Sequence, residues 1–532
     1  MTVTGDWDRR ISRRTLLKTG GSLAAGITFA GIAGGPAFAQ EGFASYPFTL
    51  GVASGDPSPT GVVLWTRLAP SPLAIGGGLP AEPYELRFEV ARDEGFHEIV
   101  RRGTTVALPD EAHSVRVEVF GLGPRHEYYY RFKAGDDISP VGRTRTTPPG
   151  NAMVPAVTFA FVSCQNFAHG YFTPYADVAE AADIEAVIHL GDYIYEGRAN
   201  EVRAHLPARE IETLEQYRIR HGQYKMDAHL QAAHAAHPWL VTWDDHEFKN
   251  NYADEDFDPD VPPERVRARR AAAYRAYWEH MPLARARKPD GPDLPLYRRF
   301  RWGAQATFNV LDGRQYRSDQ AECKPAERDA SGYCAAELSP ERSMLGGEQR
   351  EWLLEDLATT KARWNVLAQQ VGFAPFNRET AVSPRSFASP ETWDGYVADR
   401  QRILNWVVEH GTPNPVVLTG DSHQNWVRNV PPDYRSLDGD PVATEFMGTS
   451  ISTGGDPASR VLRYGGDPFN PHILFQNNNR GYVHCTLTPD SWTSEYRTVT
   501  TVERPEATTG TLATFAIQNG RAGAELVGTA AA

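Results

Sequence analysis

Short apolar runs alternate with polar, turn-rich segments along most of the chain, and the pattern changes near residue 150. Before that point, four β-rich runs, two with a clear period of two, are separated by Gly, Pro and Asp turns. They cover residues 61–66, 84–90, 115–119 and 128–132. Alternation of this kind predicts half-buried strands. We therefore expect a small β-sandwich domain over residues 44–148.

Beyond a Pro-Pro-Gly break at residues 148–150, segments with helical patterns separate the apolar runs. The predicted strands cover residues 157–162, 186–190, 239–243, 304–311 and 416–419, and the predicted helices cover residues 217–234, 263–279, 348–359 and 398–410. Nearly continuous apolar strands suit a sheet that is covered on both faces. We expect an α/β or α+β catalytic domain over residues 152–507, followed by an Ala- and Gly-rich C-terminal tail over residues 508–532.

The first 39 residues have the order of a secretory signal. Basic residues between Arg13 and Lys18 precede a weakly apolar stretch from Gly21 to Ala33 and a small-residue cleavage site that ends at Ala39. The apolar stretch is shorter than the roughly 20 residues of a membrane helix, which disfavours a permanent anchor. The arginine pair resembles a twin-arginine export signal. We expect export by the twin-arginine machinery, cleavage after Ala39 and a secreted or periplasmic protein with no stable membrane anchor.

Composition and charge narrow the possible partners. The 532 residues are 41% hydrophobic and 23% charged, which is typical of a globular protein that is large enough for two domains. The formal net charge is −13, and it becomes −16 once residues 1–39 are removed. An acidic chain argues against a nucleic-acid surface, because phosphate backbones attract basic patches. A small phosphate ester in a local cationic pocket remains compatible with this charge.

The four cysteines have different surroundings. Cys323 and Cys334 lie in a polar, loop-like stretch, and an exported protein meets oxidising conditions, so we predict a disulfide between them. Cys485 lies in an alternating run and is expected to be a small buried hydrophobe. Cys164 ends a predicted strand and belongs to the pattern described next.

Four segments that follow predicted strands carry thiol, phenol, imidazole or carboxylate groups. These groups belong to Cys164, Asp192, Tyr195, Asp244, Asp245, His246, Asn251, Asp421 and His423. Each residue alone has an ordinary structural interpretation, as a turn, a helix N-cap, a core histidine or tyrosine, or a buried thiol. Ligands of open α/β sheets collect at the carboxyl ends of strands, however, so the four segments are expected to meet. Four clustered carboxylates repel one another unless cations lie between them, which predicts a metal centre.

The segments also resemble a known family. Residues 163–165, 191–196, 243–247 and 420–423 are similar to blocks of PhoD-type alkaline phosphatases, in the calcineurin-like metallophosphoesterase class. Residues 50–67 resemble the N-terminal β domain of that family. The resemblance implies an α+β fold, in which an N-terminal β-sandwich precedes a metallophosphoesterase αββα sandwich.

The family also implies a metal cluster of Fe³⁺ and Ca²⁺. Carried over by position, Cys164, Asp192, Tyr195 and His423 would bind the iron; Asp192 as a bridge, with Asp245, Asp421, Asp244 and Asn251, would bind calcium. Thiolate, phenolate and imidazole suit a transition metal, whereas carboxylates suit calcium. Cys164 departs from most of the wider class, which carries an Asp-x-His pair there, so a site with two transition metals is disfavoured.

The resulting functional hypothesis is hydrolysis of phosphate mono- and diesters by a metal-activated water, with His246 holding phosphate or protonating the leaving group. One alternative is a phosphodiesterase that acts on phospholipids or cell-wall phosphopolymers, since it would use the same site. Another is an exported binding protein stabilised by calcium, although structural calcium has no use for Cys164 or Tyr195. Residues 312–317 follow a strand and are a candidate segment for framing the site.

Overall fold

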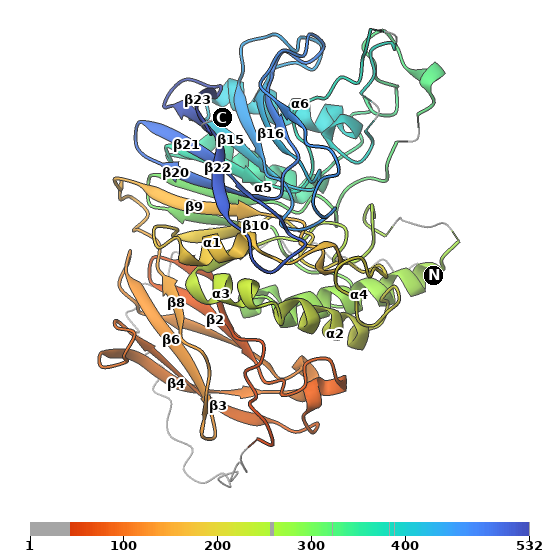
Figure 1. The fold of residues 1–532 in the computed structure, drawn as a ribbon. Coiled ribbons are helices and arrows are strands. Elements are labelled where there is room, and N and C mark those ends of the chain that lie inside the picture. The colour runs from red at the N-terminus through yellow and green to blue at the C-terminus, as the bar shows by residue number, and fades with distance from the viewer. Residues whose placement is uncertain (1–42, 256–259, 322, 382, 388, 531–532) are drawn as a thin grey trace, which may run out of the picture. The chain divides into compact units, whose positions relative to one another are not determined.

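The computed structural model describes residues 43–255, 260–321, 323–381, 383–387 and 389–530, and two mixed sheets lie at its centre (Figure 1). The first sheet has ten strands in the order β23 (Glu525–Thr529), β22 (Thr509–Gln518), β21 (Ser491–Val499), β20 (Gly481–Leu487), β9 (Val157–Val162), β10 (Ala186–His189), β11 (Pro238–Val241), β1 (Val52–Ser58), β2 (Gly61–Arg67) and β5 (Ser114–Phe120). The second has eight, in the order β12 (Arg298–Trp302), β13 (Ala306–Val310), β14 (Trp364–Ala368), β15 (Pro415–Thr419), β17 (Ala443–Met447), β16 (Asn425–Val430), β19 (Ile473–Asn477) and β18 (Leu462–Arg463).

The two sheets share one apolar core. Phe159 and Ile188 of the first sheet pack with Phe308, Val366 and Phe446 of the second. Side chains alternate along each strand, so Val187, the neighbour of Ile188, joins a different core on the opposite face of the first sheet. Strands with both faces covered are therefore apolar throughout, which is why their sequences lack the alternation seen nearer the N-terminus.

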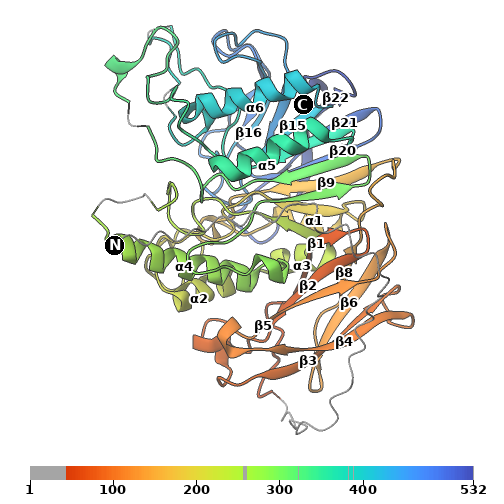
Figure 2. The same ribbon diagram turned by 180° about the vertical axis from the view of Figure 1, so that it is seen from behind.

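Helices cover the outer faces of both sheets. The first sheet is covered by α1 (Pro174–Glu180), α2 (Leu214–Lys225), α3 (Ala228–Ala236) and α4 (Pro263–His280). The second is covered by α5 (Gly346–Thr359) and α6 (Val397–His410), which lie side by side in Figure 2. The layers are thus helix, sheet, sheet, helix, and the predicted αββα architecture is confirmed. No helix in the part of the chain that the structure describes is long and apolar enough to cross a membrane.

The N-terminal strands form the predicted β-sandwich, but one of its layers is shared. A five-stranded sheet contains β4 (Ile99–Ala107), β3 (Tyr84–Ala91), β6 (Glu127–Ala134), β7 (Asp137–Ile138) and β8 (Gly142–Arg145). It packs on β2 and β5 through a core that includes Leu64, Val117, Leu86 and Phe132. The strand beside β2, β1, pairs in parallel with β11, so this layer continues directly into the first large sheet. The domain boundary near residue 150 stays a prediction.

Two predictions about local structure were wrong. The predicted tail over residues 508–532 contains β22 and β23, which extend the first sheet and bury Ala513, Phe515 and Ile517 at alternate positions. Small and polar residues between these three conceal the alternation in the sequence. The single helix predicted over residues 217–234 is two helices, since the Asp227 carboxylate accepts hydrogen bonds from the N–H groups of His229 and Leu230 and begins α3.

Two predictions about cysteines agree with the structure. Cys323 and Cys334 form a disulfide, and Cys485 is fully buried in β20. The predicted signal sequence, with its cleavage site after Ala39, lies outside the described residues.

Candidate metal centre

The four segments predicted to meet come from strands in both sheets. Neighbouring parallel strands β9, β10 and β11 deliver Cys164, Asp192 and the Asp244–Asp245 pair, and β15 of the second sheet delivers Asp421 and His423. Three overlapping groups have their ligand atoms within 4.8 Å of one another: Cys164, Asp192 and His423; Asp192, Asp245 and His246; Asp244, Asp245 and Asp421. Asp192 and Asp245 each belong to two of these groups, so the three groups form one continuous cluster.

The backbone aims these ligands directly. Cys164, Asp192, Asp421 and His423 have φ values of 59°, 58°, 60° and 56°, in the left-handed region that side chains other than glycine rarely adopt. Strained conformations of this kind persist where the surrounding structure enforces them, and they cluster at functional sites. Gly191 completes one turn, because a Cβ there would lie 2.4 Å from the Cβ and the backbone nitrogen of Asp244.

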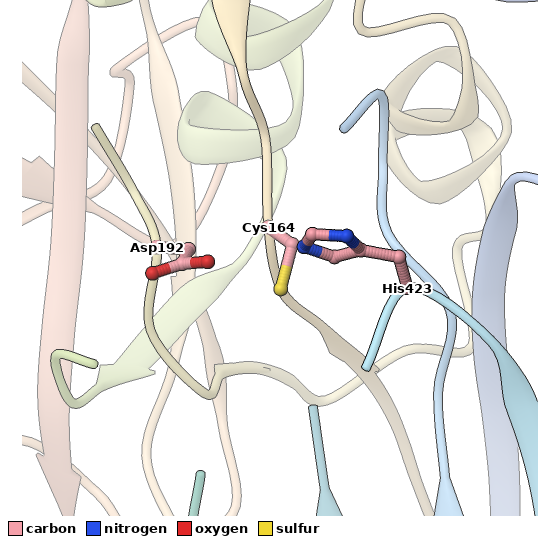
Figure 3. A group of neighbouring side chains, drawn as sticks. All are labelled: Cys164, Asp192 and His423. Carbon is pink, nitrogen blue, oxygen red and sulfur yellow. The ribbon is translucent and has the colours of Figure 1, made fainter. Parts of the chain in front are cut away.

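One half of the centre, which we call the soft-donor half, contains Cys164, Tyr195 and His423. Figure 3 shows the Cys164 thiol between the carboxylate of Asp192 and the imidazole of His423. The Tyr195 hydroxyl donates a 2.6 Å hydrogen bond to Asp192 Oδ2 and lies 3.3 Å from His423 Nε2. Burial lowers the pKa of His423 to about 3, which keeps the imidazole neutral and leaves a lone pair for a metal.

Burial also keeps the other two soft donors protonated in the absence of an ion. It raises the pKa of the Cys164 thiol and of the Tyr195 phenol well above their ordinary values, and the nearby Asp192 carboxylate raises both further. A bound cation would reverse this balance, because a metal deprotonates the thiol that coordinates it.

The other half, which we call the carboxylate half, contains Asp244, Asp245 and Asp421. The buried Arg314 forms ion pairs with Asp244 and with Asp421, the latter at 3.2 Å, and its Nη2 lies 3.7 Å from Asp245 Oδ1. Burial raises the pKa of Asp244 well above its ordinary value despite the ion pair with Arg314. The second oxygen of Asp244, Oδ2, is buried and has no hydrogen-bond partner. An unpartnered carboxylate oxygen of this kind fits a cation ligand.

Asn251 reaches the site only through its backbone contacts. Its N–H donates a 2.7 Å hydrogen bond to Asp245 Oδ2, and its carbonyl accepts from Arg317. The residue as a whole is exposed. Its assignment as a calcium ligand therefore stays a prediction.

His246 lies against both halves. Its ring stacks on Tyr195 with centroids 4.1 Å apart, and its Nδ1 lies 2.7 Å from Glu196 Oε2. Burial disfavours the charged imidazole, but Glu196, Asp245 and Asp192 outweigh it and raise the pKa of His246 well above its ordinary value. In the absence of metal ions, His246 is therefore held in one orientation with a proton to offer.

The sequence analysis assigned no individual role to four residues that organise the centre. Glu196 and Glu247 stand inside the recognised blocks, and Glu247 accepts hydrogen bonds from the backbone N–H groups of Asp192 and Asp244, at 3.0 and 2.9 Å. Arg314 lies in the segment 312–317 that was a candidate for framing the site. Thr453, which follows β17, had no sequence signal, yet its hydroxyl lies 2.8 Å from the Tyr195 oxygen.

Comparison with known proteins gives consistent matches. The family model for PhoD-like phosphatase matches residues 159–496, and the model for the N-terminal domain of PhoD-like phosphatase matches residues 35–148. Alkaline phosphatase D of Bacillus subtilis (strain 168) is 48% identical over 533 residues, which cover 96% of this chain and 88% of the relative. The solved structure of PhoD superposes with a TM-score of 0.86 at 47% identity, covering 92% of this chain and 94% of that one.

Proposed function

The chain belongs to the PhoD-like phosphatase family and is a phosphoric ester hydrolase, and we propose that its centre hydrolyses phosphate monoesters and diesters with a metal-activated water. The observation that carries the proposal is the convergence of Cys164, Asp192, His423 and three further aspartates within overlapping groups of 4.8 Å. Buried carboxylates this close together repel one another unless some are protonated or cations lie among them, and bound metal ions would supply the positive charge.

We assign the soft-donor half to Fe³⁺ and the carboxylate half to Ca²⁺. Thiolate, phenolate and imidazole are transition-metal ligands, whereas Ca²⁺ takes carboxylate oxygens. The buried, unpartnered Oδ2 of Asp244 and the neutral imidazole of His423 support this fit. Asp192 would be shared by both ions, as its place in two of the groups allows. When bound, the ions supply Lewis acidity for the ester and a nucleophile from water.

The residues around the ions have separate tasks. Glu196 orients His246 through the 2.7 Å contact to Nδ1, which leaves Nε2 for the substrate. From there, His246 holds a phosphate oxygen or protonates the leaving group. Glu247 fixes the turns of Asp192 and Asp244 to each other through their N–H groups. Cys164 acts as a ligand in this scheme, so the scheme needs no protein nucleophile.

Export belongs to the same proposal. The twin-arginine pattern between Arg13 and Lys18 and the small residues before Ala39 support a secreted or periplasmic enzyme that crosses the membrane folded. N-terminal sequencing of the mature protein tests this: a chain that begins at Gln40 supports it, and a retained Met1 contradicts it.

The central test is Asp192→Asn. We expect turnover of p-nitrophenyl phosphate and of bis-p-nitrophenyl phosphate to disappear, together with loss of bound metal, because the residue that both halves share loses its charge. Asp183→Asn is the matched control, since that carboxylate is 60% exposed and bonds only to His484 among the contacts described. Unchanged turnover in Asp192→Asn would contradict the assignment. In the wild type, the ratio of the turnover rates for the two substrates shows whether the enzyme prefers monoesters or diesters.

A further inference from the structure

We propose that Thr453 is a positioning residue, whose hydroxyl hydrogen-bonds the ligating oxygen of Tyr195 and limits the electron density that this oxygen gives to the metal. The inference rests on the proposed function, in which Tyr195 is an iron ligand. Thr453 lies in the loop that follows β17, far from Tyr195 in the sequence, and only 3% of its surface is exposed.

Three groups surround the Thr453 hydroxyl. Its oxygen lies 2.8 Å from the Tyr195 oxygen and 2.7 Å from the Cys164 carbonyl, and it accepts a 3.0 Å hydrogen bond from the N–H of Asn166. The same hydroxyl thus contacts a side chain of the soft-donor half and the backbone of the turn that presents Cys164. Among the hydrogen bonds of the described residues, no other side chain bonds to both.

The number of available protons determines which acceptor receives the hydrogen bond of the Thr453 hydroxyl. Thr453 has one proton to donate, and the candidate acceptors are the Cys164 carbonyl and the Tyr195 oxygen. While Tyr195 is a phenol, its own proton goes to Asp192 Oδ2 at 2.6 Å. As a metal ligand its oxygen is a phenolate, and an anionic oxygen is the stronger acceptor. Thr453 then donates its hydrogen bond to the Tyr195 oxygen, and this hydrogen bond draws electron density from the phenolate.

A neighbouring hydroxyl offers a matched control. Ser452 donates a 2.8 Å hydrogen bond to the carbonyl of Asn166 and anchors the same loop to the same turn, with no contact to the phenol. Both side chains are buried. A change at Ser452 therefore disturbs the loop alone, whereas a change at Thr453 also removes the hydrogen bond to Tyr195.

The test is the visible absorption spectrum of purified full-length protein reconstituted with Fe³⁺ alone. Ferric phenolate absorbs visible light through charge transfer from the phenolate, and a hydrogen bond to its oxygen increases the energy required. We expect Thr453→Val to move the band to longer wavelength, Thr453→Ser to keep the wild-type position, and Ser452→Ala to leave the band in place. Thr453→Ala provides the same comparison if the valine variant does not fold.

The outcomes separate the inference from its premise. A wild-type band that stays in place in both Thr453→Val and Thr453→Ala overturns the inference and leaves the iron centre intact. An equal shift in Ser452→Ala also overturns it, because the effect would then come from the loop. Iron-loaded wild type without a visible band contradicts the ferric phenolate of the proposed function, and the inference falls with it.

Discussion

The two halves of the centre compensate their buried polar groups in different ways. The carboxylate half contains its own cation, because Arg314 pairs with Asp244 and Asp421. The soft-donor half contains groups that bond to one another and to Asp192 as neutral species, since burial holds Cys164 and Tyr195 in their protonated forms. The comparison teaches that the first half already contains a charged pair, Arg314 with Asp245, before any ion is bound, whereas the second acquires its charge from the ion.

The largest effect is expected at Cys164, where the halves differ most. In Cys164→Ser the iron site loses its thiolate, and we expect iron affinity to fall by more than about 100-fold, beyond the range for losing an outer partner. Iron content after dialysis, measured by atomic absorption, reports it. Cys485→Ser is the control, because Cys485 is the other free buried cysteine and bonds to Ser494 instead. Equal iron loss in both variants would contradict the assigned ligand.

Arg314→Met tests whether the carboxylate half depends on its internal cation. Removing one partner of a buried ion pair costs about 3–5 kcal/mol, and we expect a loss of that size in the free energy of unfolding with EGTA present. Calcium should restore part of it, because it replaces the missing positive charge. Urea unfolding with EGTA and with calcium measures the difference.

The control for this experiment is Arg400→Met. Arg400 and Asp394 form another buried pair, at 2.8 Å, away from the predicted metal ligands. We expect Arg400→Met to lower the free energy of unfolding to a similar extent with and without calcium. If calcium fails to stabilise Arg314→Met more than Arg400→Met, then Arg314 and calcium do not share these carboxylates.

Glu196→Gln tests the residue that lies against both halves. The amide keeps the volume but removes the charge that orients and protonates His246, and we expect kcat to fall by about 10- to 100-fold with KM little changed. The loss should be larger for an alkyl phosphate than for p-nitrophenyl phosphate, because the poorer leaving group needs the proton more. Equal losses for the two substrates would argue that His246 holds phosphate instead.

A buried lysine, Lys225, has no carboxylate among its contacts in the described part of the chain, and it provides the most graded test. Lys225 lies over the rings of Trp65 and Tyr193. It also faces four buried histidines: His189, His221, His234 and His280. Burial lowers its pKa to about 7, below the ordinary 10.5 that it regains on unfolding. Between these values the unfolded chain holds a proton that the folded chain lacks, so folded wild type becomes more stable as pH rises.

Lys225→Met removes this dependence. We expect the variant to exceed wild type in free energy of unfolding at pH 7, and its advantage to shrink by about 1.4 kcal/mol per pH unit toward pH 10.5. Chemical unfolding at several pH values measures the trend. An advantage that stays constant with pH would mean that Lys225 is charged in the folded protein, as Arg314 is.

The convergence of the candidate ligands could be predicted where a polar group directly follows a strand. Four of the candidate ligands come within four residues of the end of β9, β10, β11 or β15: Cys164, Asp192, Asp245 and Asp421. An apolar run followed by a polar group therefore indicates both the strand and the candidate ligand. The layer order could be predicted for the same reason, because buried strands and amphipathic helices have different periods.

The remaining features depend on contacts between distant segments. Arg314 and Asp421 are 107 residues apart and follow two strands of the second sheet, β13 and β15. Thr453 lies 258 residues from Tyr195, and the packing of the second sheet on the first brings these two together. Neither Arg314 nor Thr453 belongs to a periodic pattern or to a motif. The C-terminal strands were missed because Ala513, Phe515 and Ile517 alternate with short polar and small residues, and their β-structure comes from pairing with β21.

The pairing of β1 with β11 has a consequence for dividing the molecule. The strand that leads to Asp244 and Asp245 has β10 on one side and β1, from the N-terminal sandwich, on the other. A catalytic fragment cut after residue 150 would expose β11 as an unpaired edge, with its apolar residues open to pairing with another chain. Chimeras that join the N-terminal segment of one family member to the remainder of another therefore exchange part of a single sheet. Their stability should depend on how well β1 of the first protein pairs with β11 of the second.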